Sequence, residues 1–224
     1  MRLFLPLLGG AAVILLAGGL YAGLFASPPD AFQGNYVRIM YVHVPSAWVA
    51  YLAVFTVFVA SILYLWKRRA VYDHVAHSAA ELGVLFTALA LAGGMIWGKP
   101  VWGTWWTWDA RLVTTAILFL IYTGYLLVRA LAEDPERGAR LAAVIGIVGA
   151  LDIPVIHYSV VWFRTLHPPA SIVRGDIKMA PPMLAALMIN LLAFTVFYAY
   201  LLILRVRLER LEAMRAALEA ETAG

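Results

Sequence analysis

The stretch from residue 97 to residue 132 reads WGKPVWGTWWTWDARLVTTAILFLIYTGYLLVRALA and joins two unlike halves. Its second half, residues 112–132, is an apolar run of the roughly 20 residues that a helix needs to cross a bilayer. Its first half, residues 97–111, holds five of the eight tryptophans of the chain. Tryptophan favours the boundary between membrane and water, where its ring and its N–H each find a suitable neighbour. The stretch therefore predicts a spanning helix that begins just after a tryptophan-rich loop.

The composition places the chain among membrane proteins with several spans. It is 63% hydrophobic and 13% charged, with a mean hydropathy of +0.83, which is more apolar than a soluble core requires. The formal net charge of +4 is small and scattered, which argues against a nucleic-acid partner. The chain has no cysteine, so disulfides and thiolate metal sites are excluded. A bound metal would rely on histidine, carboxylate, methionine or backbone ligands.

Hydropathy predicts six spanning helices. The apolar segments of sufficient length lie at about residues 3–25, 46–66, 80–97, 112–132, 140–161 and 182–204. The third is the weakest, because Gly93 and Gly94 interrupt it and Glu81 stands at its start. The first is expected to be a retained helix, since no small-residue cleavage site follows it. We therefore predict an all-α integral membrane protein with a single domain over residues 1–224, built as a bundle of six transmembrane helices.

The distribution of positive charge predicts how the bundle sits in the membrane. Six spans put both termini on one side, together with eleven of the 17 lysines and arginines. The other side holds six, which are Arg38, Lys99, Arg111, Arg164, Arg174 and Lys178. The positive-inside rule then predicts cytoplasmic termini and an external tryptophan-rich loop. On the cytoplasmic side, residues 205–224 alternate charged and apolar positions at helical spacing, which predicts a solvated amphipathic tail helix.

Two more loops on the predicted external side carry a histidine and an arginine each. The loop before the second span contains Arg38 and His43, and the loop after the fifth contains Arg164 and His167. Together with the tryptophans, these residue types fit a planar, dianionic ligand that carries a metal. Haem needs aromatic faces for its ring, one or two axial ligands for its iron and cations for its propionates.

The sequence offers candidates for each of these contacts. The macrocycle would lie on the indole faces of the tryptophan-rich loop, which are those of Trp97, Trp102, Trp105, Trp106 and Trp108. His43 and His167 would supply axial nitrogens. The propionates would meet Arg38, Lys99 and Arg111. A quinone or a lipid headgroup would use the aromatic rings but would not require two histidines.

Three further residues have competing interpretations. His157 lies ten residues before His167 and competes as a ligand, although a histidine inside a span also hydrogen-bonds neighbouring helices. Asp109 is expected to pair with Arg111 or to cap the helix that starts near it. Asp152 is an acid within the fifth span and so a functional candidate. It lies two residues before a proline, and we favour the interpretation that it satisfies backbone N–H groups freed by that kink.

Three segments resemble motifs of one known family. They are RIMYVHVPSAW at 38–48, WGKPVWGTWWTWDARL at 97–112 and DIPVIHYSVVWFRTLH at 152–167, and they are similar to the haem exporter protein C family, CcmC. Its members are bacterial inner-membrane proteins of the multi-component (System I) cytochrome c maturation pathway. The tryptophan-rich (WWD) motif alone marks a wider haem-handling superfamily, whereas the chain length and the His-Val-Pro segment favour the C component. Asp152 departs from the family pattern, in which a neutral polar residue is expected.

The resemblance implies a haem-transfer protein rather than an enzyme. Such a protein holds non-covalent, b-type haem at the periplasmic face of the membrane and loads it onto the periplasmic haem chaperone CcmE. It acts with an ABC-type ATPase (CcmA), a permease (CcmB) and a small single-span protein (CcmD). On these motifs His43 and His167 are the axial ligands, and the tryptophan-rich loop with Asp109 is the platform for haem and chaperone.

Two rival functions use similar residues. A membrane b-type haem oxidoreductase acting on quinol usually places its histidine pairs on facing helices within the bilayer, whereas the histidines here are predicted at external loop ends. A haem transporter subunit would show internal repeats and broken helices at mid-membrane, and the sequence has no clear repeat.

Overall fold

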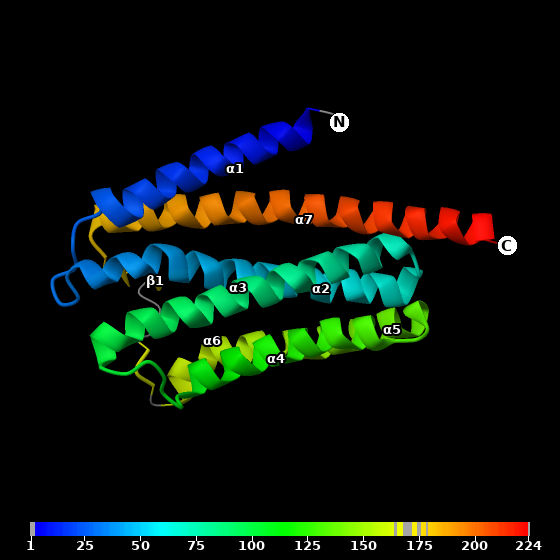
Figure 1. Cartoon of the computed structure of the whole chain (residues 1–224). Coiled ribbons are helices and arrows are strands. Elements are labelled where there is room, and N and C mark those ends of the chain that lie inside the picture. The colour runs from blue at the N-terminus through cyan, green and yellow to red at the C-terminus, as the bar shows by residue number, and fades with distance from the viewer. Residues whose placement is uncertain (1–2, 164, 168–171, 174–175, 178, 224) are drawn as a thin grey trace.

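The computed structural model describes residues 3–163, 165–167, 172–173, 176–177 and 179–223, most of them helical (Figure 1). In chain order the elements are α1 (Phe4–Tyr21), the π-helix η1 (Ala22–Ala26), the 3-10 helix η2 (Asn35–Ile39), α2 (Met40–Lys67), α3 (Ala70–Trp102), α4 (Ala110–Leu131), α5 (Pro135–Ala150), α6 (Asp152–Trp162), the strands β1 (Ile172–Val173) and β2 (Asp176–Ile177), and α7 (Pro181–Ala223). The two short strands pair antiparallel.

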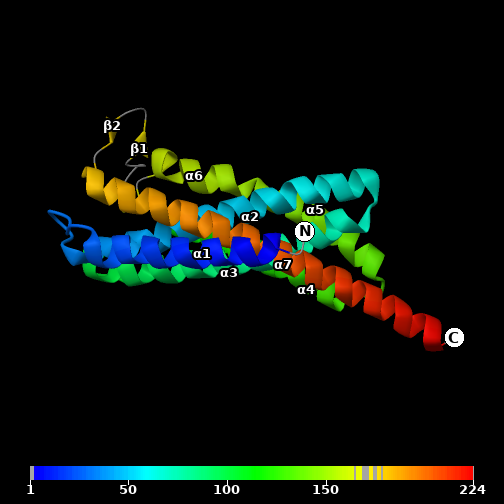
Figure 2. The same ribbon diagram turned by 90° about the horizontal axis from the view of Figure 1, so that it is seen from above.

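Within the residues that the structure describes, six helical segments are long and apolar enough to cross a membrane, which confirms the predicted all-α bundle. α5 and α6 together make the fifth of these segments. Figure 1 shows both termini and the α2–α3 and α4–α5 turns at one end, which we call the tail end. The opposite end holds η2, residues 103–109 and the segment after α6, and we call it the tryptophan end. α7 extends past the other helices at the tail end (Figure 2).

α3 is longer and more regular than the sequence predicts. It runs without interruption for 33 residues, through both Gly93 and Gly94. These glycines allow a close approach of α2, because a Cβ at Gly94 would lie 3.0 Å from Cε1 of His43. In a membrane, where contacts between helices rest on packing, small residues at such a contact strengthen it.

The tryptophan-rich stretch is only partly a loop. α3 continues to Trp102 and ends at Gly103, whose φ of 80° is one that glycine adopts without strain. Trp97 and Trp102 therefore lie on α3, and the prediction of a loop over residues 97–111 is wrong for them. The loop itself is confined to residues 103–109, because α4 begins at the next residue.

α2 also begins earlier than predicted. It starts at Met40 rather than at residue 46, and η2 leads directly into it. His43 is therefore a helical residue and not a loop residue as predicted. A side chain on a packed helix is held more firmly than one on a loop, so α2 gives His43 a fixed position.

Small residues let the helices pack closely in the core. Ala53, Ala79 and Ala142, from α2, α3 and α5, are fully buried, as is common in helix contacts within membranes. Some buried polar groups are paired across helices. The hydroxyl of Tyr122 donates to the carbonyl of Gly146 at 2.9 Å, which joins α4 to α5.

The fifth span is broken at Leu151, between α5 and α6. Pro154 accounts for the break, because it has no N–H and its ring conflicts with the carbonyl four residues earlier, that of Ala150. The favoured role for Asp152 is not found. Among the residues described, its Oδ2 is buried without a hydrogen-bond partner, and no side chain caps α6.

Candidate functional site

His43 is fixed in the contact between α2 and α3 at the tryptophan end. Its Nδ1 lies 2.9 Å from the carbonyl oxygen of Ala90. A carbonyl oxygen only accepts hydrogen bonds, so Nδ1 carries the proton and Nε2 of the neutral ring keeps its lone pair. The backbone of α3 thus selects the tautomer that can bind a metal through Nε2.

Trp97 lies beside His43 on α3. The two rings meet edge to face, with their centroids 5.8 Å apart. The indole N–H of Trp97 donates to Oε1 of Gln33 at 2.8 Å, which ties the loop before η2 to α3. Three neighbours on α3 therefore set the orientation of the imidazole: the Ala90 carbonyl, the bare Cα of Gly94 and the Trp97 ring.

His167 follows α6 and is held by two residues from around the 103–109 loop. Its ring meets Trp102 edge to face, with a centroid distance of 4.8 Å, and its Nδ1 lies 3.2 Å from Oδ2 of Asp109. Burial lowers the pKa of His167, Asp109 opposes this effect, and Arg111 lowers the pKa further. A histidine with a pKa below its usual value of about 6.5 is neutral at pH 7, which is the form that binds metals.

Asp109 divides its two oxygens between a helix cap and His167. Oδ1 accepts from the backbone N–H of Leu112 at 3.0 Å, which caps α4 and confirms one of the two predicted roles. Oδ2 accepts from the hydroxyl of Thr107 at 2.9 Å and also faces His167. The other predicted role, an ion pair with Arg111, is not among the ion pairs of the described residues.

Arg111 lies in the first turn of α4, which begins directly after the loop that holds Asp109. Its positive charge lowers the pKa of His167. Nη2 of Arg111 donates to the carbonyl of His157 through a long bond of 3.4 Å. Its Nε is buried and has no partner among the described residues. The fold thus brings the two histidines and a cation with one unpaired buried donor to the same end of the bundle.

Arg38 and Lys99 donate hydrogen bonds to backbone carbonyls at the ends of helices. The terminal nitrogens of Arg38 donate to the carbonyls of Leu24 (2.7 Å) and Ser27 (3.2 Å), which are left open where η1 ends. Nζ of Lys99 is exposed and donates to the carbonyl of Gly103 at 3.1 Å. Both cations therefore already bind the backbone of this end.

The five tryptophans form two groups rather than one flat surface. Trp97 and Trp102 contact the histidines. Trp105 and Trp108 are 57% and 85% exposed. Trp106 is half-buried and meets Trp108 edge to face at a centroid distance of 5.8 Å. The inner pair borders the site, and the outer rings are open to the surroundings.

His157 lies on α6 and is exposed. Its ring packs against Tyr158 with a centroid distance of 5.2 Å, and its contact with Arg111 runs through the backbone carbonyl. Its side chain therefore gives the site no described contact, which makes His157 a natural control for the other two histidines.

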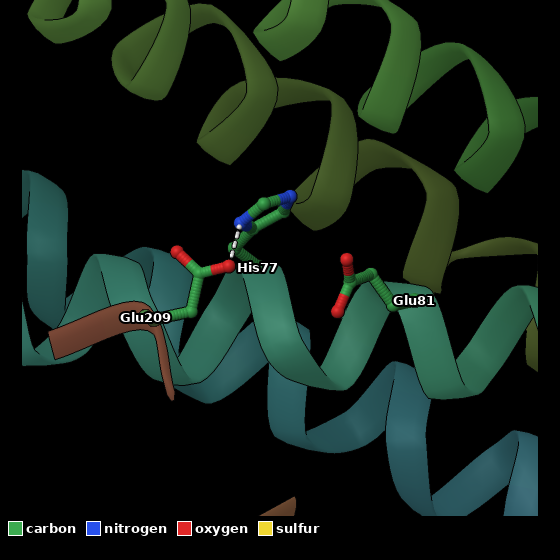
Figure 3. Close-up of side chains that lie close together, drawn as sticks. All are labelled: His77, Glu81 and Glu209. Carbon is green, nitrogen blue, oxygen red and sulfur yellow. Dashed lines mark ion pairs between the residues drawn. The ribbon is translucent and has the colours of Figure 1, made fainter. Parts of the chain in front are cut away.

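A second group of ionisable residues lies toward the tail end (Figure 3). His77 and Glu81 on α3 and Glu209 on α7 bring three potential metal ligands within 4.8 Å of one another. Nδ1 of His77 lies 3.0 Å from Oε1 of Glu209. Arg205 donates to Glu81 at 2.6 and 2.9 Å and to Glu209 at 3.1 Å.

One guanidinium thus already binds both carboxylates of this group. Because it supplies the positive charge that a metal ion would bring, we interpret the group as an ion-pair network that fastens α7 to α3. The sequence alone does not predict this network. The only signals were two pairs at helical i, i+4 spacing, His77 with Glu81 and Arg205 with Glu209, and the sequence does not show that they meet.

The fold and the first site together define a class: a helical membrane protein of six spans that gathers two histidines, an arginine and several tryptophans at one end. The model of one protein family, described as heme exporter protein C (CcmC), matches residues 1–221. The chain belongs to the heme exporter protein C family.

Individual relatives agree with this assignment. Heme exporter protein C of Bradyrhizobium diazoefficiens is 43% identical over 95% of this chain and 84% of its own length. Heme exporter protein C of Haemophilus influenzae is 40% identical over 92% of this chain and 85% of its own. A putative cytochrome c biosynthesis ccmC-like mitochondrial protein of Arabidopsis thaliana is 35% identical over 98% of this chain and 84% of its own.

Proposed function

We propose that this chain binds haem at the tryptophan end and delivers it for the maturation of c-type cytochromes. Family membership supports this role, since relatives are named heme exporter protein C and a plant relative is named for cytochrome c biosynthesis. The observation that carries the proposal is the pair of histidines. His43 and His167 each have Nδ1 held by an acceptor, which leaves Nε2 of each ring available in the same region.

In this proposal His43 and His167 are the axial ligands of the haem iron. Both rings contact a tryptophan of α3: Trp97 contacts the ring of His43, and Trp102 contacts the ring of His167. These indoles would border the apolar face of the macrocycle. The chain has no cysteine to form a thioether bond, so the haem would be held without a covalent link, as in b-type haem proteins.

The proposed place of action is the periplasmic face of the bacterial inner membrane. The excess of lysine and arginine beside the termini supports cytoplasmic termini and a periplasmic tryptophan end. There the exposed Trp105 and Trp108 would meet the haem chaperone CcmE. CcmA, CcmB and CcmD would be the other partners of the complex. The chain would bind and release haem without making or breaking a covalent bond, and so is not an enzyme in this proposal.

Absorbance spectroscopy of the purified protein tests the proposal. We expect a Soret band and the low-spin signature of iron with two imidazole ligands, and loss of that band from this chain when it is separated again after incubation with purified CcmE. Protein that acquires no haem from a haem-replete membrane contradicts the proposal. Rapid reduction of the bound haem by quinol would instead favour the oxidoreductase.

Replacing Arg111 by lysine is expected to lower haem affinity about 10-fold, although the charge is kept. A guanidinium binds a carboxylate through two parallel hydrogen bonds and an ammonium cannot, and a charged hydrogen bond contributes about 1.5–3 kcal/mol. Arg38→Lys tests the second predicted propionate contact. The measurement is haem absorbance per mole of purified protein.

The exposed Arg137 provides the matched control, because it lies in the first turn of α5, next to the α4–α5 turn at the tail end, and Arg137→Lys makes the same change far from the site. Haem dimethyl ester, which lacks the two acids, separates propionate recognition from other effects. If the wild-type protein binds the ester as tightly as haem, recognition of propionates by these arginines is refuted.

Gly94→Ala is expected to weaken haem binding, whereas Gly93→Ala should leave it near the wild-type level. The Cβ added at Gly94 lies 3.0 Å from Cε1 of His43, so the imidazole has to move. The Cβ added at Gly93 lies 3.5 Å from Cβ of His43, which is an ordinary contact. Both changes raise helix propensity equally. Equal haem affinities in the two variants would show that the position of His43 is unimportant.

A further inference from the structure

Asp109 is the one side-chain acceptor described beside either histidine. Its Oδ2 lies 3.2 Å from Nδ1 of His167, across 58 residues of sequence, and both side chains are largely buried, with exposed fractions of 7% and 16%. His43 differs, because its Nδ1 faces the neutral backbone carbonyl of Ala90. The two rings therefore have unequal partners.

A carboxylate at this position has two physical effects. An ionised carboxylate only accepts hydrogen bonds, so it fixes the proton of His167 on Nδ1. The other ring nitrogen, Nε2, then keeps a free electron pair. Its negative charge also draws that proton away from the ring, which makes Nε2 a stronger donor to a metal. A neutral carbonyl has the first effect and little of the second.

We infer that Asp109 is a positioning residue for haem, which holds His167 in its ligating tautomer and makes it the stronger of the two axial ligands. This inference rests on the proposed function, since it assumes that His167 binds the iron. It assigns the acid of the tryptophan-rich motif a role in haem binding beyond the cap of α4. The two roles use different oxygens, because Oδ1 caps Leu112 and Oδ2 faces His167.

Asp109→Asn separates the two roles. Asparagine caps a helix about as well as aspartate, so the start of α4 is kept. The amide has a single oxygen. If that oxygen caps Leu112, the NH₂ group faces Nδ1 of His167 and favours the tautomer with its proton on Nε2, so that Nε2 has no electron pair for iron. Loss of an outer-shell partner of this kind typically weakens metal binding about 10- to 100-fold.

We therefore expect Asp109→Asn to bind haem about 10- to 100-fold more weakly than the wild type. The haem that remains bound should have a higher reduction potential, because a weaker donor stabilises ferric iron less. Asp109→Ser, which keeps a capping hydroxyl but does not reach His167, should raise the potential as well. Thr107→Val removes only the other hydrogen bond of Oδ2 and should leave affinity and potential near the wild-type values.

His167→Ala distinguishes failure of this inference from failure of the proposed function. If His167→Ala keeps the wild-type spectrum, the ligand assignment itself is wrong. If His167→Ala loses that spectrum while Asp109→Asn and Asp109→Ser keep the wild-type affinity and potential, Asp109 is only a helix cap and the inference is overturned. Helical content by circular dichroism identifies a variant that fails to fold, and the remaining Asp109 variant then decides the question.

Discussion

Replacing either His43 or His167 with alanine is expected to convert the bound iron from a low-spin, six-coordinate state to a high-spin state with one protein ligand. Haem affinity should fall by more than the roughly 10- to 100-fold that follows loss of an outer-shell partner, because a ligand itself is removed. The measurements are the absorbance and electron paramagnetic resonance spectra of the purified variants and the rate of haem loss to a competing haem protein.

His157→Ala is the matched control for both substitutions. The ring of His157 is exposed and packs on Tyr158, and its contact with Arg111 uses the backbone carbonyl that alanine retains. This variant should therefore have the wild-type spectrum. Unchanged spectra in both the His43 and the His167 variants would show that neither residue binds the iron. A changed spectrum in the His157 variant alone would assign the iron to His157.

Removing the two exposed indoles with Trp105→Ala and Trp108→Ala together should block delivery of haem while leaving haem binding intact. These rings are 57% and 85% exposed and make no contact with either histidine among the contacts described. Tryptophans at the centre of protein interfaces commonly contribute about 2 kcal/mol or more each. We expect transfer to CcmE to slow about 30-fold or more, as measured by the haem absorbance of each protein when the two are separated at successive times after mixing.

Two other variants make this test specific. Trp66→Ala removes a ring of similar exposure, 76%, near the C-terminal end of α2, which is the end away from His43. This variant should transfer haem normally. Trp102→Ala should weaken haem binding itself, because Trp102 contacts His167. Normal transfer by the Trp105 and Trp108 double variant would mean that the chaperone does not use these indoles.

The six spans could be predicted because each is an apolar run of about the length that a bilayer requires. The ends of α2 and α3 could not. At Gly98, Lys99 and Pro100 hydropathy falls, yet α3 continues to Trp102. Hydropathy reports where the lipid ends, whereas a helix ends where its carbonyls find other partners, as they do at Gly103.

The candidate site was predictable in its residue types and not in its pairings. The histidines, tryptophans and arginines are visible as a composition that suits haem. The partners that orient the rings are distant, since Ala90 lies 47 residues from His43 and Asp109 lies 58 residues from His167. Arg38 shows the same limit, because nothing in the sequence indicates that its guanidinium binds the carbonyls of Leu24 and Ser27. Such contacts depend on which helices meet.

α7 is a single helix of 43 residues, which corresponds to a length of about 65 Å. A bilayer with its headgroups is about 40–45 Å thick, so about 20 Å of this rod must project from the membrane at the tail end. The opposite end of the rod packs Met183 against Met40 and Tyr41, within three residues of His43. The same helix thus joins two distant places: its projecting turns begin beyond the ion pairs of Arg205, and its first turns pack beside the segment that carries His43.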